Sequence, residues 1–428
     1  MTVKKSMKMV KKPKASAKKS VRHNKLYVPE PKARPGEAPD FSNMVIPDAG
    51  ALPRPAVDIH HDEIAHYADD MIRVLDDNGK AVGEWDPKLS PALLLEGLSH
   101  MVLTREFDDR MQNTQRVGKI SFYMRSRGEE AVSVAHSMAL GEDDMSFPTY
   151  RQQGILISRG YDLEKMMCQL FGNKKDPVKG RQLPVMYSSN EKGKGYFTIS
   201  GNLATQYIQA VGWAMAEAYK GTDNLATAFV GDGATAENDV HAAMVFAAVY
   251  KAPVILNIVN NQWAISSFQG IAGGETATFA RRGRGYGLPS LRIDGNDFLA
   301  VYAASKWAAD RARAGLGATV IEHVTYRAGA HSTSDDPSKY RPDAEAEKWP
   351  LGDPVERLKQ HLIGLGKWSE KEHEELVKDK KAYVSKTYKT AESYGFGKSH
   401  GLNVADMFTD VYEDMPLHLL RQRQELGV

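Results

Sequence analysis

Between residues 203 and 325, short apolar segments alternate with longer segments of helical character. Strands are expected at 225–230, 253–260, 290–293 and 318–325, and helices at 203–220, from about 235 to 250, and at 297–314. Strictly alternating strands and helices are typical of a parallel sheet covered by helices on both faces. The sequence therefore predicts an α/β fold of this kind.

The two ends of the sequence differ from this central part. Ten of the 56 basic residues and no acidic residue lie in 1–25, where the lack of apolar periodicity predicts a disordered basic tail, a solvated arm for an acidic partner. Residues 26–89 include a proline-rich stretch that excludes helix interiors, so we expect an extended arm and linker. A helix is expected after Ser90, opening an α/β domain over 90–350, and the charged residues 351–428 are expected to form a helical C-terminal region.

Charge and composition exclude several classes of protein. The chain has a formal net charge of +2, but without the basic tail 46 basic and 54 acidic residues leave −8, so we expect no nucleic-acid partner. One cysteine in 428 residues excludes a disulfide-stabilised secreted scaffold. The apolar stretch at 240–259 is interrupted by His241, Lys251 and Pro253, which favours a buried helix and strand over a membrane span.

A glycine-rich turn and an asparagine pair mark the expected ligand site. The turn after the strand at 225–230 consists of Gly231, Asp232, Gly233 and Ala234. The next strand ends in Asn260 and Asn261. In an open parallel sheet, ligands bind at the carboxyl ends of strands, where glycine lets the backbone approach a diphosphate and the next helix presents its N-terminal amides. Asp232 and Asn261 offer oxygen ligands of the kind that Mg²⁺ prefers, and the carbonyl of Trp263 is a third candidate.

Two other interpretations of this pattern stay open from the residues alone. Gly-Asp-Gly also occurs as an ordinary tight turn. Gly231, Gly233 and Ala236 fit the loose form of a dinucleotide-binding fingerprint, but the acidic residue expected about 20 positions later to bind a ribose is missing. The strand before the turn, the helix after it and the strand that ends in Asn-Asn favour a diphosphate–magnesium site.

The spacing of Gly-Asp-Gly and Asn-Asn resembles the signature of thiamine-diphosphate enzymes, in which about 25 to 30 residues separate the two motifs. Further segments resemble the alpha subunit of branched-chain 2-oxo acid dehydrogenase E1, from about residue 27 to the C-terminus. These segments are 179–184, 203–206, 292–297, 330–336 and 410–416. The resemblance implies the thiamine-diphosphate-binding fold, and the residues around His331 differ from those of pyruvate-directed relatives.

The resemblance also assigns roles around the expected site. The implied Mg²⁺ ligands are Asp232, Asn261 and the backbone carbonyl of Trp263. Tyr150 and Arg151 would bind the diphosphate, and Leu203 would offer its backbone to the aminopyrimidine ring. A potassium site of some relatives corresponds to Ser200, Asn202, Thr205 and Gln206. Asn202 stands where relatives have proline, and Val259 stands where relatives can carry an arginine that reaches the diphosphate, so Arg151 is expected to take more of that role.

His331 is the expected catalytic residue. It lies after a predicted strand in a polar loop, as is typical of an ordered active-site loop. The resemblance implies that it contacts the phosphate end of the cofactor and donates a proton when the acyl group passes to a lipoyl arm. Ser332 matches a serine that is phosphorylated in mitochondrial relatives, where a phosphate would repel the lipoyl domain. Phe122 matches a residue that packs on branched acyl chains, and a core position is equally expected for it.

The implied reaction is the oxidative decarboxylation of a branched-chain 2-oxo acid with thiamine diphosphate and Mg²⁺, followed by reductive acylation of the lipoyl group of an E2 acyltransferase. In the family, the glutamate that activates the aminopyrimidine belongs to a separate beta subunit, and no residue of this chain is a persuasive substitute. We therefore expect an alpha2-beta2 heterotetramer and an inactive isolated chain.

Three alternatives are separable by experiment. A pyruvate-directed alpha subunit would differ in substrate preference. A self-sufficient thiamine enzyme would need a longer chain, because one polypeptide then carries both cofactor-binding domains. A non-catalytic docking protein is disfavoured by the complete set of Arg151, Asp232, Asn261 and His331. We expect a cytoplasmic location in a bacterium, and a mitochondrial one only if the basic tail is a transit peptide.

Overall fold

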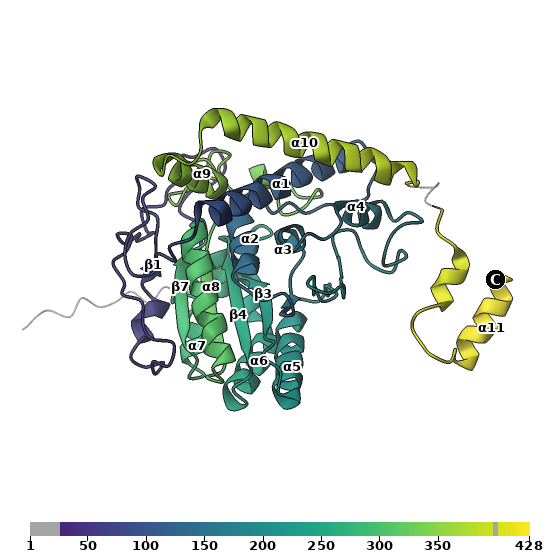
Figure 1. Ribbon diagram of the computed structural model, residues 1–428, viewed down its shortest axis with the longest axis horizontal. Coiled ribbons are helices and arrows are strands. Elements are labelled where there is room, and N and C mark those ends of the chain that lie inside the picture. Colours follow the sequence, from purple (N-terminus) through teal and green to yellow (C-terminus); the bar gives the residue numbers. More distant parts are fainter. Residues whose placement is uncertain (1–25, 397–400) are drawn as a thin grey trace, which may run out of the picture.

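A six-stranded sheet forms the centre of the molecule (Figure 1). The computed structural model describes residues 26–396 and 401–428, so the expected disordered tail lies outside the described residues. Every neighbouring pair of strands is parallel, in the order β1-β7-β8-β4-β3-β2. The strands are β1 (Met71–Ile72), β2 (Met145–Phe147), β3 (Ala226–Gly231), β4 (Val254–Asn260), β7 (Ser290–Asp294) and β8 (Thr319–Val324).

Alternate residues of the strands pack into two different cores. On β4, Ile255 lies in the core that contains α8, whereas Leu256 and Ile258 lie in the core that contains α5 and α6. Because successive side chains of a strand point to opposite faces, helices cover both faces of the sheet. These helices are α2 (Glu130–Met138), α5 (Thr205–Lys220), α6 (Asn238–Val249) and α8 (Phe298–Arg313). The predicted α/β fold is confirmed.

A further layer of helices lies outside α2 and α8. In Figure 1, α10 (Glu370–Ser393) runs beside α1 (Pro91–Arg116), next to α9 (Pro354–Gly364). The predicted start of α1 is confirmed, since the Ser90 hydroxyl accepts a hydrogen bond from the Leu93 amide at 3.3 Å. The other helices are α3 (Gln153–Ser158), α4 (Leu163–Phe171), α7 (Arg281–Arg284) and α11 (Leu417–Leu426). Throughout 26–396 and 401–428, no helix combines the length and apolarity that crossing a bilayer requires.

The helix expected from residue 203 starts two residues later, at Thr205. Ala204, the residue before it, has a φ of 65°, and a right-handed helix cannot extend back through a residue in the left-handed conformation. Leu203 is therefore outside the helix and 53% exposed. The sequence pattern could not predict this, because Leu203 and Ala204 continue the apolar and small-residue character of the helix.

The N-terminal arm forms turns but no helix or strand between residues 26 and 64. It lies against the α8 layer through backbone carbonyl groups that accept hydrogen bonds from buried indoles. Trp85 donates to the Pro53 carbonyl at 3.0 Å, and Trp307 donates to the Pro55 carbonyl at 2.9 Å. Trp85, after β1, and Trp307, on α8, thus hold the proline-rich segment in place.

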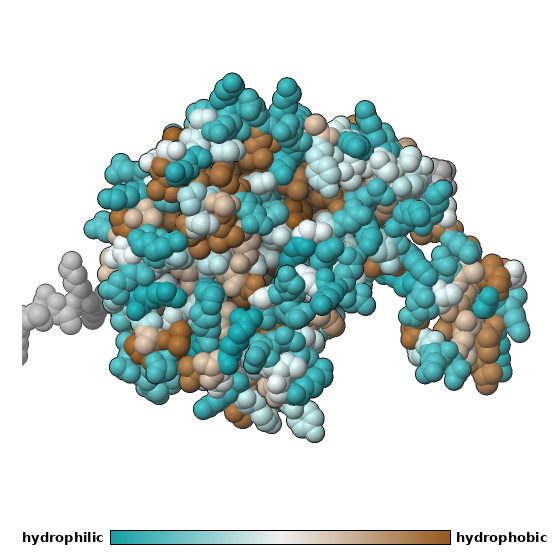
Figure 2. Space-filling view, in the orientation of Figure 1, coloured by the Kyte–Doolittle hydropathy of each residue, from teal (hydrophilic) through white to brown (hydrophobic). Residues whose placement is uncertain are grey.

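The C-terminal helix α11 contributes no residue to a core. Leu417, Leu420 and Leu426 are exposed, and Figure 2 shows apolar side chains gathered on this segment. The segment before it is anchored at the loop around Arg181, whose guanidinium donates to the Thr409 carbonyl at 2.7 Å. The C-terminal part thus presents an apolar helix surface to the surroundings.

Candidate active site

The register of two neighbouring strands brings the two sequence motifs together. Gly231 at the end of β3 pairs with Val259 of β4, so Asp232 and Asn261 follow adjacent strand ends. A short hairpin, β5 (Trp263–Ala264) and β6 (Ser267–Phe268), follows Asn261. These elements border a cavity of about 440 Å³ at the carboxyl edge of the sheet, where ligands bind in open parallel sheets.

Most of the residues predicted from the sequence line this cavity. From the glycine-rich turn and the asparagine pair, these are Asp232, Gly233, Ala234, Asn261 and Trp263. From the other segments, these are Tyr150, Arg151, Ser200, Leu203, Gln206 and His331. Thr205, Phe122 and Ser332 do not line it: Phe122 is half-buried against a neighbouring hydrophobic cluster, and Ser332 is 8% exposed in the loop beside His331.

Asp232 has a carboxylate oxygen without a partner. Its Oδ1 accepts a hydrogen bond from the Gly233 amide at 2.9 Å, whereas its buried Oδ2 has no hydrogen-bond partner among the described residues. Burial raises the pKa of Asp232 to about 7. An unpaired buried oxygen is costly unless a ligand satisfies it, so this position fits a bound cation.

The segment after β4 supplies the other two predicted metal ligands. Asn261 is 7% exposed, and its Oδ1 lies 3.4 Å from the Trp263 amide. The Trp263 carbonyl accepts a hydrogen bond from Arg327 at 2.7 Å, which leaves the second lone pair of that oxygen for a further partner. Gln262, between them, has a φ of 74°, and its side-chain amide donates to Oδ1 of Asn260 at 3.1 Å. That hydrogen bond offsets part of the cost of the left-handed turn.

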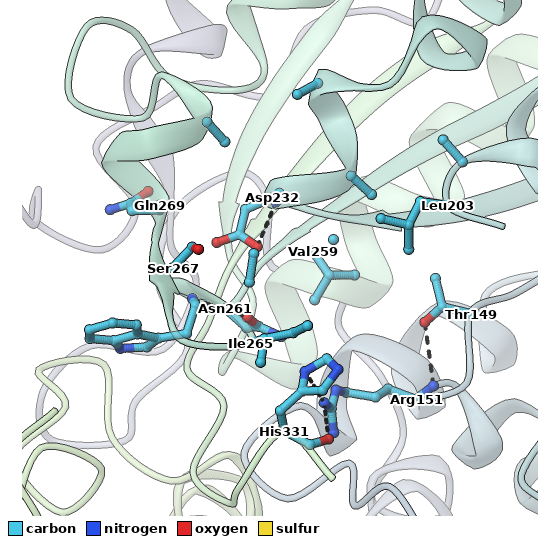
Figure 3. Close-up of a pocket in the computed structure, with 18 of the residues that line it drawn as sticks. Thr149, Arg151, Leu203, Asp232, Val259, Asn261, Ile265, Ser267, Gln269 and His331 are labelled. Atoms are coloured by element: carbon cyan, nitrogen blue, oxygen red, sulfur yellow. Dashed lines mark hydrogen bonds between the residues drawn. The ribbon is translucent and has the colours of Figure 1, made fainter. Parts of the chain in front are cut away.

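Arg151 and His331 form a second polar pair in the same pocket. Arg151 is buried, and its Nη2 donates to Nδ1 of His331 at 3.1 Å and to the His331 carbonyl at 2.5 Å. Because a guanidinium only donates, Nδ1 accepts and the ring proton resides on Nε2. Burial, together with Arg151 and Arg327, lowers the pKa of His331 to about 3, so the ring is neutral. Figure 3 shows Asn261 between Asp232 and this pair.

The loop that carries His331 is ordered by its own side chains. Oδ2 of Asp335 accepts hydrogen bonds from the His331 amide at 2.7 Å and from the Tyr340 hydroxyl at 2.6 Å. Arg327 donates to the same hydroxyl at 2.8 Å. The Ser332 hydroxyl oxygen accepts from the Ser334 amide at 3.2 Å, inside this network. A new charge at Ser332 would therefore act on the contacts that fix His331.

The segment before α5 holds the polar groups expected at a potassium site. Two of them are linked by Asn202, whose amide donates to the Ser200 hydroxyl at 3.1 Å and whose carbonyl accepts from the Thr205 hydroxyl at 3.2 Å. Gln206 is buried and donates its amide to the Phe229 carbonyl at 2.6 Å. This amide ties the turn to β3, next to the glycine-rich turn.

Glu129 also lines the pocket, and the sequence pattern gave no reason to select it. Acidic residues before an apolar helix are expected there for their effect on helix stability alone, and Glu129 directly precedes α2. It contacts Asn261, which is 132 residues away in sequence. The only available signal was the tandem of two acidic residues, Glu129 and Glu130, after Gly128.

The mouth of the pocket is apolar and exposed. Leu203, Ile265 and Ile271 line the cavity and are 53%, 54% and 55% exposed. We call these three residues the pocket rim. An exposed apolar rim around a polar floor is typical of a site covered by a partner or ligand.

Comparisons with known proteins agree with these observations. The family model described as dehydrogenase E1 component matches residues 99–399, and a model of the N-terminal segment of the 2-oxoisovalerate dehydrogenase E1 alpha subunit matches residues 22–62. The chain is 60% identical over 405 residues to 2-oxoisovalerate dehydrogenase subunit alpha of Pseudomonas aeruginosa, covering 94% of this chain and 98% of that one. It is 40% identical over 364 residues to the mitochondrial subunit alpha of Mus musculus, covering 83% and 79%, and 38% identical over 361 residues to subunit alpha 1 of Arabidopsis thaliana, covering 83% and 74%.

Proposed function

This chain belongs to the dehydrogenase E1 component family, and from that membership we propose that it is the alpha subunit of a branched-chain 2-oxo acid dehydrogenase. In this role it takes part in the thiamine-diphosphate-dependent decarboxylation of a branched-chain 2-oxo acid and in the transfer of the acyl group to the lipoyl group of an E2 acyltransferase. Its relatives carry the name of the 2-oxoisovalerate enzyme, which favours a branched substrate over pyruvate.

One observation supports the site assignment above the others. The unpaired Oδ2 of Asp232, the side chain of Asn261 and the pair Arg151–His331 line a single pocket at the carboxyl edge of the sheet. A divalent cation binds oxygen ligands and a diphosphate suits a guanidinium, and residues from four segments of the chain meet in one pocket to supply both. We therefore assign the metal end to Asp232, Asn261 and the Trp263 carbonyl.

The other residues bind and orient the rest of the cofactor. We assign the diphosphate to Tyr150, Arg151, His331 and the backbone at Gly233 and Ala234, and the aminopyrimidine to the backbone of Leu203. When bound, thiamine diphosphate supplies the electron sink that decarboxylation requires. Because Arg151 occupies Nδ1, Nε2 is the ring nitrogen of His331 that remains for a ligand, so we expect His331 to bind and exchange protons through Nε2.

A second subunit is part of this proposal. The acidic residues among those that line the described pocket are Glu129 and Asp232, and both are committed to the metal end. The carboxylate that activates the aminopyrimidine therefore comes from elsewhere, and the exposed pocket rim offers a surface for the chain that brings it. We propose a beta subunit in an alpha2-beta2 heterotetramer, with E2 as a further partner, in the cytoplasm of a bacterium.

Co-expression with a beta-type subunit from the same source tests the proposal. The complex should decarboxylate 3-methyl-2-oxobutanoate with thiamine diphosphate and Mg²⁺, and the isolated chain should not. Sustained turnover by the chain alone would refute the need for a partner, and a preference of the complex for pyruvate would refute the substrate.

The metal site has its own test. Asp232→Ala removes the unpaired carboxylate oxygen, so the complex should lose Mg²⁺-dependent binding of thiamine diphosphate in a calorimetric titration. Binding equal to that of the unaltered complex would contradict the assignment of Asp232.

Potassium and phosphorylation extend the proposal to the segments around 200 and 332. Ser200, Thr205 and Gln206 supply polar groups next to the pocket, and we propose that K⁺ orders this turn. Replacing K⁺ with Na⁺ should lower the thermal midpoint of the complex, and an unchanged midpoint would exclude the site. Phosphorylation of Ser332 would act through the contacts of the His331 loop.

A further inference from the structure

Two adjacent carboxylates at the start of α2 point to different parts of the molecule. Glu130 is fully buried and forms an ion pair with Arg105 at 2.8 Å. Glu129 is 2% exposed and lines the candidate active site. The two residues share one backbone segment and one degree of burial, but only Glu129 is in contact with the pocket.

Glu129 connects the two ends of the pocket. Its Oε1 accepts a hydrogen bond from Nδ2 of Asn261 at 2.7 Å, and the same oxygen lies 4.0 Å from Nε of Arg151. Arg151 in turn donates to His331. A continuous chain of polar contacts therefore runs from Asn261 through Glu129 and Arg151 to His331.

The hydrogen bond between Glu129 and Asn261 fixes the orientation of the Asn261 side-chain amide. An asparagine amide has an NH₂ end that only donates and an oxygen end that only accepts, and a metal ion requires the oxygen. A carboxylate can only accept, so Glu129 fixes the NH₂ end against itself. The oxygen end is then turned toward Trp263, where its hydrogen bond is long at 3.4 Å, and is free to serve as a ligand.

The position of Glu129 is itself tightly determined. Gly128 has a φ of 93°, and a side chain there would place its Cβ 2.3 Å from the Tyr326 carbonyl. The Gly128 carbonyl accepts hydrogen bonds from Thr325 at 2.9 Å and Asn296 at 3.3 Å. The residue before Glu129 is thus clamped against the end of β8, which gives the carboxylate a fixed origin.

We propose that Glu129 is a positioning residue for the divalent cation: it orients the Asn261 amide so that Oδ1 faces the metal, and it pairs with Arg151 at the diphosphate end. This role rests on the proposed metal site. Outer residues that orient a metal ligand typically contribute 10- to 100-fold to metal affinity. The contribution of Glu129 comes from the place of its acceptor oxygen rather than from its charge.

Two substitutions separate the effect of the position of the Glu129 acceptor oxygen from the effect of its charge. Glu129→Gln keeps an acceptor oxygen at the same reach and removes the charge. Glu129→Asp keeps the charge and withdraws the acceptor by one methylene. The matched control is Glu130→Gln, which alters an equally buried neighbour outside the pocket and keeps an acceptor oxygen for the Gly128 amide, which donates to Glu130 at 2.8 Å.

The measurement is the dissociation constant of Mg²⁺ at saturating thiamine diphosphate, obtained by calorimetry on the complex with its beta subunit. We expect Glu129→Asp to weaken Mg²⁺ binding about tenfold or more, and Glu129→Gln to weaken it less than about threefold. Glu130→Gln should lower the thermal midpoint and leave the Mg²⁺ dissociation constant unchanged, because it weakens only the structural ion pair with Arg105.

The outcomes distinguish this inference from the function on which it rests. A larger loss in Glu129→Gln than in Glu129→Asp would assign the effect to charge and overturn the proposal. Equal losses at 129 and 130, or no loss at 129, would overturn it as well. If the unaltered complex showed no Mg²⁺-dependent cofactor binding, the proposed function itself would fail. If Asp232→Ala abolished Mg²⁺-dependent cofactor binding and the Glu129 variants had no effect on it, the role of Glu129 would be refuted and the proposed function would stand.

Discussion

His331 is surrounded by positive charge. Arg151 donates to its Nδ1, and Nη1 of Arg327 lies 3.5 Å from the same nitrogen. A protonated ring would face two guanidinium groups in a largely buried place, which explains the low pKa of about 3. In the cofactor-free protein, the histidine therefore stays neutral over the whole physiological range.

This environment predicts a pH-dependent stability. The pKa of His331 is about 3 in the folded chain and about 6.5 in the unfolded chain. Below pH 6.5 His331 is protonated in the unfolded state but not in the folded state, so the free energy of unfolding falls as the pH decreases toward 3. The cost at pH 5 is about 2 kcal/mol. Between pH 8 and pH 5, the free energy of unfolding should therefore fall by about 2 kcal/mol less in His331→Gln than in the unaltered protein. Urea unfolding at the two pH values measures this difference. An equal pH dependence of both proteins would contradict a neutral His331.

Some site residues follow directly from the sequence, and others do not. Asp232 and Asn261 could be predicted because parallel strand ends lie at one edge of a sheet, and the register of β3 and β4 brings them together. Glu129 could not be predicted, because its contact with Asn261 depends on how α2 packs against the sheet. That Oδ2 of Asp232 is buried without a hydrogen-bond partner likewise depends on the residues that pack around it, so the sequence alone could not predict it.

At the scale of helices and strands, the N-cap residue of α8 also binds a second segment of the chain. Asp297 is fully buried; its Oδ1 accepts from the amides of Leu299 and Ala300, and its Oδ2 accepts from those of Val74 and Leu75. One carboxylate thus both caps α8 and ties the segment after β1 to it. The N-cap of α10, Ser369, accepts only within its own exposed turn.

Removing the two N-cap side chains should lower the free energy of unfolding by very different amounts. Asp297→Ala loses a helix cap, worth about 1 kcal/mol, and leaves two further buried amides without partners, at about 1–3 kcal/mol each. We expect a loss of at least about 3 kcal/mol in the free energy of unfolding for Asp297→Ala, against about 1 kcal/mol for Ser369→Ala. Chemical denaturation of both variants checks this, and similar losses would show that the link to the segment after β1 contributes little.

The boundaries of helices and strands were predictable where characteristic residues mark them. The four predicted strands, β3, β4, β7 and β8, begin and end within a residue of the segments expected from their apolar runs, and the Ser-Pro start of α1 is found as predicted. The short edge strands β1 and β2 were not predicted, and β1 lies within residues 26–89, which were expected to form only an arm and linker. The start of α5 was not predictable, because nothing in the residue types of Leu203 and Ala204 indicates the left-handed conformation of Ala204. That conformation leaves Leu203 exposed at the pocket rim.

At the scale of the whole molecule, the N-terminal arm covers α8. Besides the two indole contacts, the Arg311 guanidinium on α8 donates to the carbonyls of Val57 and Ile59, the latter at 3.1 Å. The arm therefore satisfies polar groups of α8 that would otherwise lie unpaired under it. Sequence composition predicted an extended arm from its prolines, but not the α8 surface that receives it.

Removing the arm should destabilise the body. A chain that begins at residue 60 lacks the carbonyl partners of Trp85, Trp307 and Arg311. Compared with a chain that begins at residue 26, we expect a lower thermal midpoint and a shift of tryptophan emission to longer wavelength, because water reaches the buried indoles. Identical midpoints and spectra would mean that the arm merely rests on the surface.

The exposed pocket rim has a thermodynamic consequence. A cofactor beneath Leu203, Ile265 and Ile271 and a subunit above them would pack on the same three side chains, so each would order part of the surface that the other binds. Cofactor loading and subunit assembly are then linked, and reciprocity requires that the factor by which the partner tightens cofactor binding equals the factor by which the cofactor tightens assembly. The supply of the vitamin-derived cofactor would thereby set how much of the complex exists, in addition to how fast each assembled complex turns over.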